Sequence, residues 1–352
     1  MNRDRAAAIG REPHGSADDP DLLDFSANTN PAVPDGTERV YRAAFDRART
    51  YPAEPPDGFR AAAADAVGCA PESVVPTPGG LAAIRTAVAL AVDDGDTAVV
   101  PAPSFGEYAR EVRLQGGEPA FVDAGSVLDA DPSDHALAVV CHPNNPTGTA
   151  YDRDALLSFA DRCRAADTVL LVDEAFLGFT DRTSLAGTDG VVVARALTKL
   201  FGLPGIRAGY AVATGDLGAA VRGARRAWNL SAPAIATAKY CLRRDGFVRE
   251  TRDRVRRERE RMRAALVAAG FDVRPSAAPF LLLDVGDRGV DRVVGRARER
   301  GVAVRDATTF RGLDSHVRVA VRRPAENDRL LAALDAAGDD GDRRENGGDA
   351  GV

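Results

Sequence analysis

The stretch Ala196-Leu-Thr-Lys-Leu-Phe-Gly-Leu-Pro-Gly-Ile-Arg-Ala-Gly-Tyr210 joins two apolar runs, VVVARAL from Val191 and AGYAVA from Ala208. Its Gly and Pro residues are typical of a turn, so the sequence predicts a strand, a polar connection and a second strand. Three similar runs occur earlier in the chain: TAVVP from Thr97, ALAVVC from Ala136 and TVLLVD from Thr168. Because these runs are continuously apolar rather than alternating, we expect strands that are buried on both faces.

Helix-like stretches alternate with these runs from residue 37 to residue 230. They cover residues 58–67, 81–92, 107–115 and 154–166. Helices between continuously apolar strands imply a mostly parallel mixed sheet with helices on its faces. We therefore expect a large α/β domain over residues 37–230.

The rest of the chain differs in composition. Residues 1–36 are rich in Pro, Asp and Asn and lack a sustained period, which predicts an extended N-terminal arm. Residues 231–337 combine a long helix over 247–269 with strands near 279 and 317 and a final helix, which predicts a smaller α+β domain. The tail 338–352 is made mostly of Gly and charged residues, which predicts disorder.

Composition argues against several classes of protein. The 352 residues include 46 basic and 52 acidic ones, and the net charge of -6 does not suit a nucleic-acid or acidic-membrane binder. The four cysteines form no CxxC pair, so we expect neither a zinc cluster nor a disulfide framework, and the histidines have no metal-ligand spacing. Neither a signal-peptide pattern nor a run of about 18 apolar residues is recognisable, so we expect a cytoplasmic protein.

The motifs GxGxxG, GxxxxGK(S/T), GxSxG and HExxH do not occur, which argues against dinucleotide, P-loop, serine-hydrolase and zinc-protease chemistry. The sequence instead indicates chemistry that uses the amine of a lysine side chain. Lys199 and Lys239 are the only lysines, and Lys199 follows a predicted strand. A lysine in that position suits a Schiff base with a carbonyl cofactor. Arg207, eight residues later, and the hydroxyl of Thr198 are suited to hold a phosphate.

Three other polar segments follow predicted strands or begin predicted helices. Asp173 ends the run TVLLVD, where a carboxylate is costly unless it meets a cation such as a protonated pyridine nitrogen. In Cys141-His-Pro-Asn-Asn-Pro-Thr-Gly148, a tight turn presents Asn145, whose amide suits a phenolate oxygen. In Thr77-Pro-Gly-Gly-Leu81, two glycines open a helix whose free N–H groups suit a phosphate. Ligands of open α/β sheets bind at such strand ends.

Together, the segments NPTG, DEAF and TK, with an arginine eight residues after the lysine, resemble those of the fold-type I pyridoxal-phosphate enzymes, the aspartate aminotransferase superfamily. The likeness extends from His14 to about Leu334. Within the superfamily, the chain is most similar to the threonine-phosphate decarboxylase family of cobalamin biosynthesis, which is related to the histidinol-phosphate aminotransferases. Two segments favour the decarboxylases: Asp24-Phe-Ser-Ala-Asn-Thr-Asn-Pro31 and Ala325-Glu-Asn-Asp-Arg-Leu-Leu-Ala-Ala-Leu334.

The resemblance implies a role for each candidate residue. Lys199 would hold pyridoxal 5'-phosphate as a Schiff base, Asp173 would pair with the pyridine nitrogen, and Asn145 would contact the 3-oxygen. Phe105 would stack on the ring. The phosphate would be held by residues from three segments and from the second subunit of a homodimer: Arg207, Thr198, the amides of Gly79, Gly80 and Leu81, and the second subunit's Tyr51.

The resemblance also implies the residues that bind substrate. Arg318 matches the superfamily's arginine for the substrate carboxylate. Arg322 is the candidate for a substrate phosphate, with His14 and Asn28 nearby on the arm. Three residues depart from the family pattern, since Ala196 lacks a hydroxyl, Pro78 lacks an N–H and Phe176 replaces a tyrosine. The last departure favours the decarboxylases.

The expected function is therefore pyridoxal-phosphate-dependent decarboxylation of O-phospho-L-threonine to (R)-1-aminopropan-2-yl phosphate and carbon dioxide. The expected partners are a phosphorylated amino acid substrate and a second copy of the chain, with no nucleic acid and no membrane. Two alternatives stay open. One is an aminotransferase that acts on histidinol phosphate or an aromatic amino acid, and the other is a catalytically silent cofactor-binding or regulatory protein.

Overall fold

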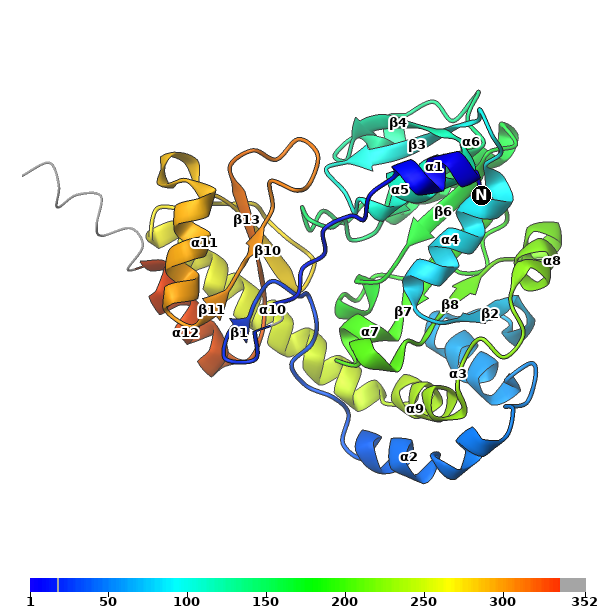
Figure 1. Cartoon of the computed structure of the whole chain (residues 1–352), viewed down its shortest axis with the longest axis horizontal. Coiled ribbons are helices and arrows are strands. Elements are labelled where there is room, and N and C mark those ends of the chain that lie inside the picture. Colours follow the sequence, from blue (N-terminus) through cyan, green and yellow to red (C-terminus); the bar gives the residue numbers. More distant parts are fainter. Residues whose placement is uncertain (18, 336–352) are drawn as a thin grey trace, which may run out of the picture.

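The apolar runs around Lys199 belong to one mixed sheet of seven strands. The computed structural model, which describes residues 1–17 and 19–335, orders these strands β2-β8-β7-β6-β5-β3-β4 (Figure 1). Six of them run in one direction, and β8 is antiparallel to its neighbours β2 and β7. Their bounds are β2 Val74–Thr77, β3 Thr97–Ala102, β4 Glu118–Asp123, β5 Leu137–Cys141, β6 Val169–Asp173, β7 Val191–Ala196 and β8 Gly209–Val212. The prediction of a mostly parallel sheet is confirmed.

The two strands that the sequence did not predict, β2 and β4, lie at the edges of this sheet. Each contains a proline, Pro76 in β2 and Pro119 in β4. Proline lacks the N–H that a central strand needs, so it is found mainly in edge strands; in the central strand β3, Pro101 lies beyond the two residues that pair with β5. In β2 and β4 the proline interrupts an apolar pattern that is already short. In β4, four of the six residues are only half-buried and the two ends are exposed, so no continuous apolar run marks this strand.

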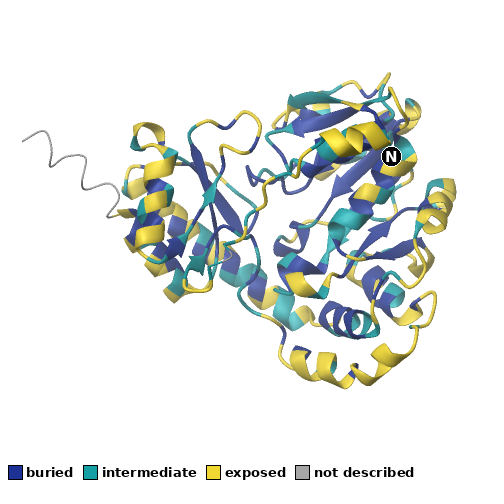
Figure 2. Cartoon of the chain, viewed as in Figure 1, coloured by how far each residue is buried: buried dark blue, intermediate teal, exposed yellow. Residues whose placement is uncertain are grey.

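Helices cover both faces of the seven-stranded sheet, so most of its strand residues are buried (Figure 2). One buried cluster joins the sheet to α4 (Gly80–Ala91), α5 (Glu107–Gln115) and α8 (Gly215–Ala224). A second cluster joins the opposite face to α3 (Asp57–Val67), α6 (Arg153–Ala165) and α9 (Ala232–Leu242). The helix α2 (Thr37–Ala43) packs against α9 outside this layer, and the single-turn helix α7 (Leu197–Leu200) follows β7.

A smaller unit is built on a four-stranded antiparallel sheet in the order β12-β13-β10-β9. Its strands are β9 Asp272–Val273, β10 Phe280–Asp284, β12 Arg305–Asp306 and β13 His316–Ala320, and its helices are α10 Asp245–Ala268, α11 Val290–Glu299 and α12 Pro324–Asp335. The expected boundary at residue 231 precedes α9, which packs against α2 and α3 rather than against this sheet. The predicted tail, 338–352, lies outside the described residues.

The N-terminal arm contributes more to the core than an extended segment would. Its helix α1 (Arg3–Ala8) packs against α5, and its strand β1 (Leu23–Asp24) pairs in parallel with β11 (Val302–Ala303) of the smaller unit. Phe25, directly after β1, is fully buried. The expectation of an arm without a core element is therefore wrong at Phe25. The apolar stretch around it is too short to show a period in the sequence.

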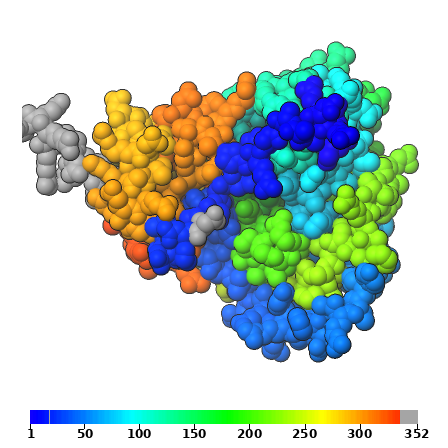
Figure 3. Space-filling model, in the orientation of Figure 1, coloured from blue at the N-terminus to red at the C-terminus, as the bar shows by residue number. Residues whose placement is uncertain are grey.

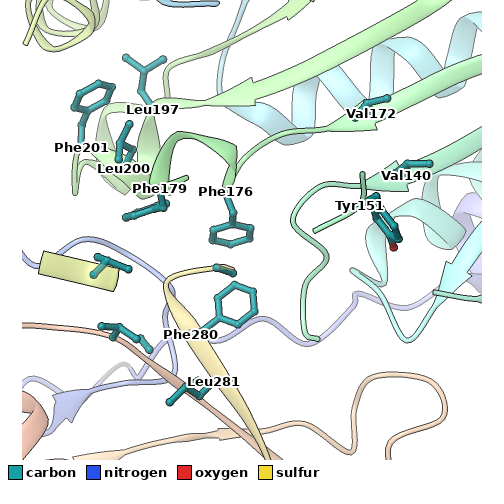
Figure 4. Close-up of a cluster of buried hydrophobic side chains, with 14 of the residues drawn as sticks. Val140, Tyr151, Val172, Phe176, Phe179, Leu197, Leu200, Phe201, Phe280 and Leu281 are labelled. Atoms are coloured by element: carbon teal, nitrogen blue, oxygen red, sulfur yellow. The ribbon is translucent and has the colours of Figure 1, made fainter. Parts of the chain in front are cut away.

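The two units share a continuous hydrophobic core (Figure 4). Phe176, from the segment after β6, meets Phe280 of β10 edge to face, with ring centroids 5.1 Å apart. The same cluster includes Leu197 and Leu200 of α7. The position of Lys199 is thus coupled to the packing between the units.

Within residues 1–17 and 19–335, no helix is long and apolar enough to cross a bilayer. The same residues contain no group of three or more His, Cys, Asp or Glu side chains placed to hold a metal ion.

We predict that Phe25→Ala lowers the free energy of unfolding by about 3 kcal/mol, because it removes a buried ring and leaves a cavity. Urea unfolding followed by circular dichroism measures the change. Val267→Ala, which shortens a side chain that is 48% exposed on α10, is the matched control and should have little effect. Equal midpoints for Phe25→Ala and wild type would show that the arm does not contribute to the core.

Candidate active site

A cavity of about 230 Å³ lies where the carboxyl ends of the large sheet's strands meet the smaller unit. The arm crosses over it, and Figure 3 shows this blue segment lying across the junction between the two units. The lining residues come from the arm, the start of α5, the strand ends and the smaller unit: Glu12, Pro13, His14, Gly15, Asn28, Phe105, Gly106, Tyr108, Cys141, Asn145, Asp173, Ala175, Phe176, Lys199, Arg305, Thr309, Phe310 and Arg318.

Lys199 lies in α7, directly after β7, and its neighbours Leu197 and Leu200 are buried in the core. Burial lowers the pKa of Lys199 to about 8, and the positive charges of Arg318 and Arg207 act in the same direction. The negative charge of Asp173 opposes them. A larger fraction of the amine is therefore unprotonated near neutral pH than in a free lysine, and the unprotonated amine is the form that attacks a carbonyl.

Asp173 ends β6 and faces the same cavity. Its Oδ2 accepts a hydrogen bond of 2.6 Å from the hydroxyl of Tyr108, and its Oδ1 accepts one of 2.9 Å from the N–H of Ala175. Burial raises the pKa of Asp173, while these two hydrogen bonds lower it. Neither donor is a cation, so the buried carboxylate suits a positively charged ligand group.

Asn145 lies in the turn after β5, and the side chain of its neighbour Asn144 fixes that turn. Asn144 Nδ2 donates to Pro103 O at 3.0 Å and to Thr147 Oγ1 at 2.9 Å. Asn145 Oδ1 accepts a hydrogen bond of 2.6 Å from Arg318 Nη1. The amide therefore points into the cavity and toward the smaller unit.

Phe105 lines the cavity from the loop before α5. Its ring meets that of Tyr108 edge to face, at 5.5 Å between centroids, and lies 5.8 Å from the imidazole of His14. One wall of the cavity is thus aromatic, and Phe176 lines it as well.

The predicted phosphate cup is assembled around the start of α4. Gly79 has a φ of +94°, and a Cβ there would lie 2.6 Å from Arg207 Nη2. A Cβ on Gly80 would meet the Cβ of Ala196 at 3.1 Å, so the cup has little room for side chains. No side chain caps α4, so the N–H groups of Gly80 and Leu81 are left for a ligand. Thr198 of α7 is buried beside Lys199.

Arg318 lies on β13 and reaches the cavity from the smaller unit. It is buried, and its Nη2 donates to the backbone oxygen of Ser26 at 2.7 Å. Its Nε and the Oδ1 of Asn28 are both buried without a hydrogen-bond partner. These two orphaned atoms, a donor and an acceptor, mark the part of the cavity that is suited to a polar ligand.

Arg305 is a second arginine that faces the cavity, closer to the arm. Its guanidinium donates to the backbone oxygens of His14 and Pro13 at 3.0 and 2.8 Å and to Thr309 Oγ1 at 2.9 Å. Its Nε has no partner. His14 is in turn held by Glu107, with Nε2 and Oε1 3.1 Å apart.

Seven predicted site residues do not line this cavity. Five of them belong to the predicted phosphate cup: Gly79, Gly80, Leu81, Thr198 and Arg207. The other two, Arg322 and Tyr51, lie elsewhere. Arg322 binds Asp24 O through Nη1 at 3.0 Å and Glu326 Oε1 through Nη2 at 3.1 Å, so its guanidinium fastens β1 to α12. The structure therefore does not bring Arg322 to the position expected for a substrate phosphate. Tyr51 is 78% exposed and packs against the exposed ring of Trp228 at 4.6 Å, away from its own chain's cavity.

Sequence reasoning did not assign three residues that the structure places in or beside the site: Tyr108, Glu107 and Arg305. Tyr108 follows Phe105 by one helical turn, which is a spacing that brings two side chains to one side of a helix and could have indicated it. Glu107 is buried at the first turn of α5, where a carboxylate is common at a helix start. Arg305 carries no local signal, since it is one arginine among many.

These residues fit pyridoxal 5'-phosphate. The uncapped start of α4 and Arg207 suit its phosphate, the buried carboxylate of Asp173 suits its ring nitrogen, and Lys199 suits its carbonyl. The unpartnered Nε of Arg318 and Oδ1 of Asn28 are left for a substrate.

Comparison with known proteins agrees with this geometry. The family model for aminotransferase class I and II matches residues 20–334. The chain is 30% identical over 321 residues to histidinol-phosphate aminotransferase 1 of Archaeoglobus fulgidus, covering 89% of this chain and 98% of that protein.

Solved structures are similar as well. L-threonine-O-3-phosphate decarboxylase from Porphyromonas gingivalis superposes with a TM-score of 0.80 at 27% identity, covering 89% of this chain and 98% of that one. Histidinol-phosphate aminotransferase from Sinorhizobium meliloti, solved in complex with pyridoxal 5'-phosphate, superposes with a TM-score of 0.79 at 23% identity over 89% of each chain. Because the family model spans most of its length, the chain belongs to the aminotransferase class I and II family, and it has the fold-type I architecture of these pyridoxal-phosphate enzymes.

Proposed function

We propose that this chain decarboxylates O-phospho-L-threonine to (R)-1-aminopropan-2-yl phosphate and carbon dioxide. One observation supports this proposal above the others: Arg318 and Arg305, which are direct partners in the β12–β13 register, both face the cavity of Lys199. Guanidinium groups bind carboxylates and phosphates, so two of them suit a substrate with two anionic groups. Phosphothreonine has a carboxylate and a phosphate, whereas histidinol phosphate has only the phosphate.

Pyridoxal 5'-phosphate, when bound, supplies a carbonyl that condenses with amines and a ring that accepts the electron pair released at Cα. In this proposal Lys199 would hold the cofactor through its carbonyl, and Asp173 would keep a negative charge beside the ring. Cleavage of the bond between Cα and the carboxylate releases carbon dioxide, and a proton must then be added to Cα. Lys199 Nζ is the group in the cavity best suited to deliver that proton, since its pKa is lowered to about 8.

Arg318 and Arg305 would act by orientation. Arg318, fixed by Ser26 and Asn145, would hold the carboxylate end of the substrate. Arg305, fixed by the arm, would hold the phosphate end, with His14 next to it. A substrate held at both ends has little freedom to rotate about Cα, so binding energy at the remote phosphate helps to select the bond that breaks.

A second candidate function is transamination of histidinol phosphate. The observation that favours it is the sequence likeness to histidinol-phosphate aminotransferases, such as that of Archaeoglobus fulgidus at 30% identity. The same two arginines would then bind the phosphate of the amine donor and the carboxylates of 2-oxoglutarate in turn. The two reactions differ in their products, so one measurement separates them.

The active form in this proposal is a homodimer. The rings of Tyr51 and Trp228 are both exposed and pack against each other, with centroids 4.6 Å apart. Contiguous exposed apolar surface marks protein contacts. The second subunit's Tyr51 would complete the phosphate cup of the first.

The test of the reaction incubates the purified enzyme with pyridoxal 5'-phosphate and either O-phospho-L-threonine or histidinol phosphate plus 2-oxoglutarate. We expect carbon dioxide and aminopropanol phosphate from the first mixture and no glutamate from the second. Glutamate formation without carbon dioxide release would establish the aminotransferase instead.

We predict that Lys199 reacts with acetic anhydride at a rate that rises through pH 8 in the cofactor-free chain. The lowered pKa means that the reactive amine becomes abundant between about pH 7 and pH 9, rather than two pH units higher. Mass spectrometry of the labelled peptides measures it, and the peptide with Lys239 corrects for the pH dependence of the reagent. A midpoint near 10.5 would contradict the electrostatics described for the site.

We predict that Arg305→Ala lowers kcat/KM for phosphothreonine by about 10²-fold, a loss of roughly 2.7 kcal/mol of binding to the transition state. Activity on unphosphorylated threonine, which is expected to be low, should change much less. Arg322→Ala is the matched arginine variant outside the cavity, and it should affect stability rather than the preference for the phosphate. If Arg322→Ala instead lowered kcat/KM for phosphothreonine and Arg305→Ala did not, Arg322 would be the residue that binds the phosphate.

A further inference from the structure

A buried charged network lies behind the cofactor cavity, on the other side of the strand ends. The side chain of Glu174, the residue after Asp173, is 0% exposed, and its Oε2 accepts hydrogen bonds from Arg195 Nη1 at 3.0 Å and from Ser184 Oγ at 2.6 Å. Its Oε1 accepts one of 2.8 Å from the N–H of Leu185. Tyr210, a fully buried residue of β8 and the register partner of Arg195, lies beside this pair.

The three members of this network belong to the three segments that bear the proposed cofactor ligands. Glu174 directly follows Asp173, Arg195 precedes Lys199 by four residues, and Tyr210 follows Arg207 by three. Arg195 and Tyr210 are direct partners in the β7–β8 register, and Asp173 is the partner of Ala194 in the β6–β7 register. A shift of any one segment therefore moves a cofactor ligand relative to the other two.

On one side, the ends of β6, β7 and β8 are not tightly packed. A cavity of about 380 Å³ borders Glu174, Arg195 and Tyr210, between α7 and the first turns of α10. Where side chains are not tightly packed, hydrogen bonds and the ion pair must fix the relative position of the strand ends. Buried ion pairs serve poorly as a source of stability, because desolvation offsets the attraction, so a role in positioning explains this pair better.

The ion pair of Glu174 and Arg195 has no net charge, and it lies close to the charged groups Asp173 and Lys199. With Glu174 present, the positive charge of Arg195 is balanced four residues from Lys199. Without it, an uncompensated buried cation would lie in β7, four residues before Lys199. The net field at Lys199 thus depends on both members being present.

We propose that Glu174, Arg195 and Tyr210 are positioning residues that hold Asp173, Lys199 and Arg207 in register for the cofactor. This proposal rests on the proposed roles of those three ligands, and cofactor binding by the wild-type chain tests those roles separately. The network touches neither cofactor nor substrate. It acts through the backbone of β6, β7 and β8 and through the balance of charge.

The test compares Glu174→Gln and Arg195→Met in the full-length chain, by cofactor titration and by the pH dependence of Lys199 labelling. Glu174→Gln leaves the cation unbalanced, so the labelling rate of Lys199 at pH 7 should rise about fivefold, as for a pKa lower by about one. Arg195→Met leaves the anion unbalanced, so the rate should fall by about ninefold, as for a pKa higher by about one. Both variants should bind pyridoxal 5'-phosphate at least tenfold more weakly than wild type.

The double variant Glu174→Gln/Arg195→Met keeps the charge balanced and guards against loss of folding in the single variants. It should label Lys199 as wild type does, yet bind the cofactor more weakly and turn over more slowly, with KM for substrate little changed. Glu258→Gln, which breaks a partly exposed pair with Arg261 in the smaller unit, is the control and should change stability alone. A folded double variant with wild-type cofactor affinity and turnover would overturn the proposal. If wild type itself bound no cofactor, the proposed roles of Lys199 and Asp173 would fail instead.

Discussion

Burial of the Asp173 carboxylate is the constraint on which the arrangement around the cavity depends. A charge at the end of a buried strand must be met by donors or by a cation, and the fold supplies Tyr108 from α5 and the N–H of Ala175. The hydroxyl of Tyr108 reaches it only if α5 lies along that face of the sheet, which also brings Phe105 to the cavity wall. Neither hydrogen-bond donor to this carboxylate is a cation, and a protonated pyridine nitrogen would be one.

The part of the cavity that is proposed to bind substrate is lined by arginines, and these are oriented in a different way from Asp173. Arg318 and Arg305 both come from the smaller unit, and both are oriented by backbone oxygens of the arm rather than by carboxylates. Carbonyl oxygens orient a guanidinium without neutralising its charge, so both cations remain available to an anionic ligand. The arm therefore sets the direction of the groups that meet the substrate, and the shared core around Phe176 and Phe280 sets the distance between the two units.

The central parallel strands and the residues at their carboxyl ends were predictable, because continuous apolar runs and the polar residues after them are local signals. Lys199, Asp173 and Asn145 were identified in this way and face one cavity. The edge strands β2 and β4 and the buried Phe25 were not, since prolines or a short pattern hid them. Nor was the choice between two arginines of the smaller unit. Arg305 and Arg322 look alike in the sequence, and only the path of the arm decides which one faces the cavity.

The pairing of β1 with β11 has a consequence for biosynthesis. Residues 23 and 24 leave the ribosome well before their partners, residues 302 and 303. The large sheet can fold while translation continues, as domains generally do, but β1 must remain unpaired until residue 303 has been made. A nascent chain that has been made only as far as Lys199 contains the arm but lacks β11, Arg305 and Arg318. The part of the cavity that these arginines line is thus completed after the large sheet.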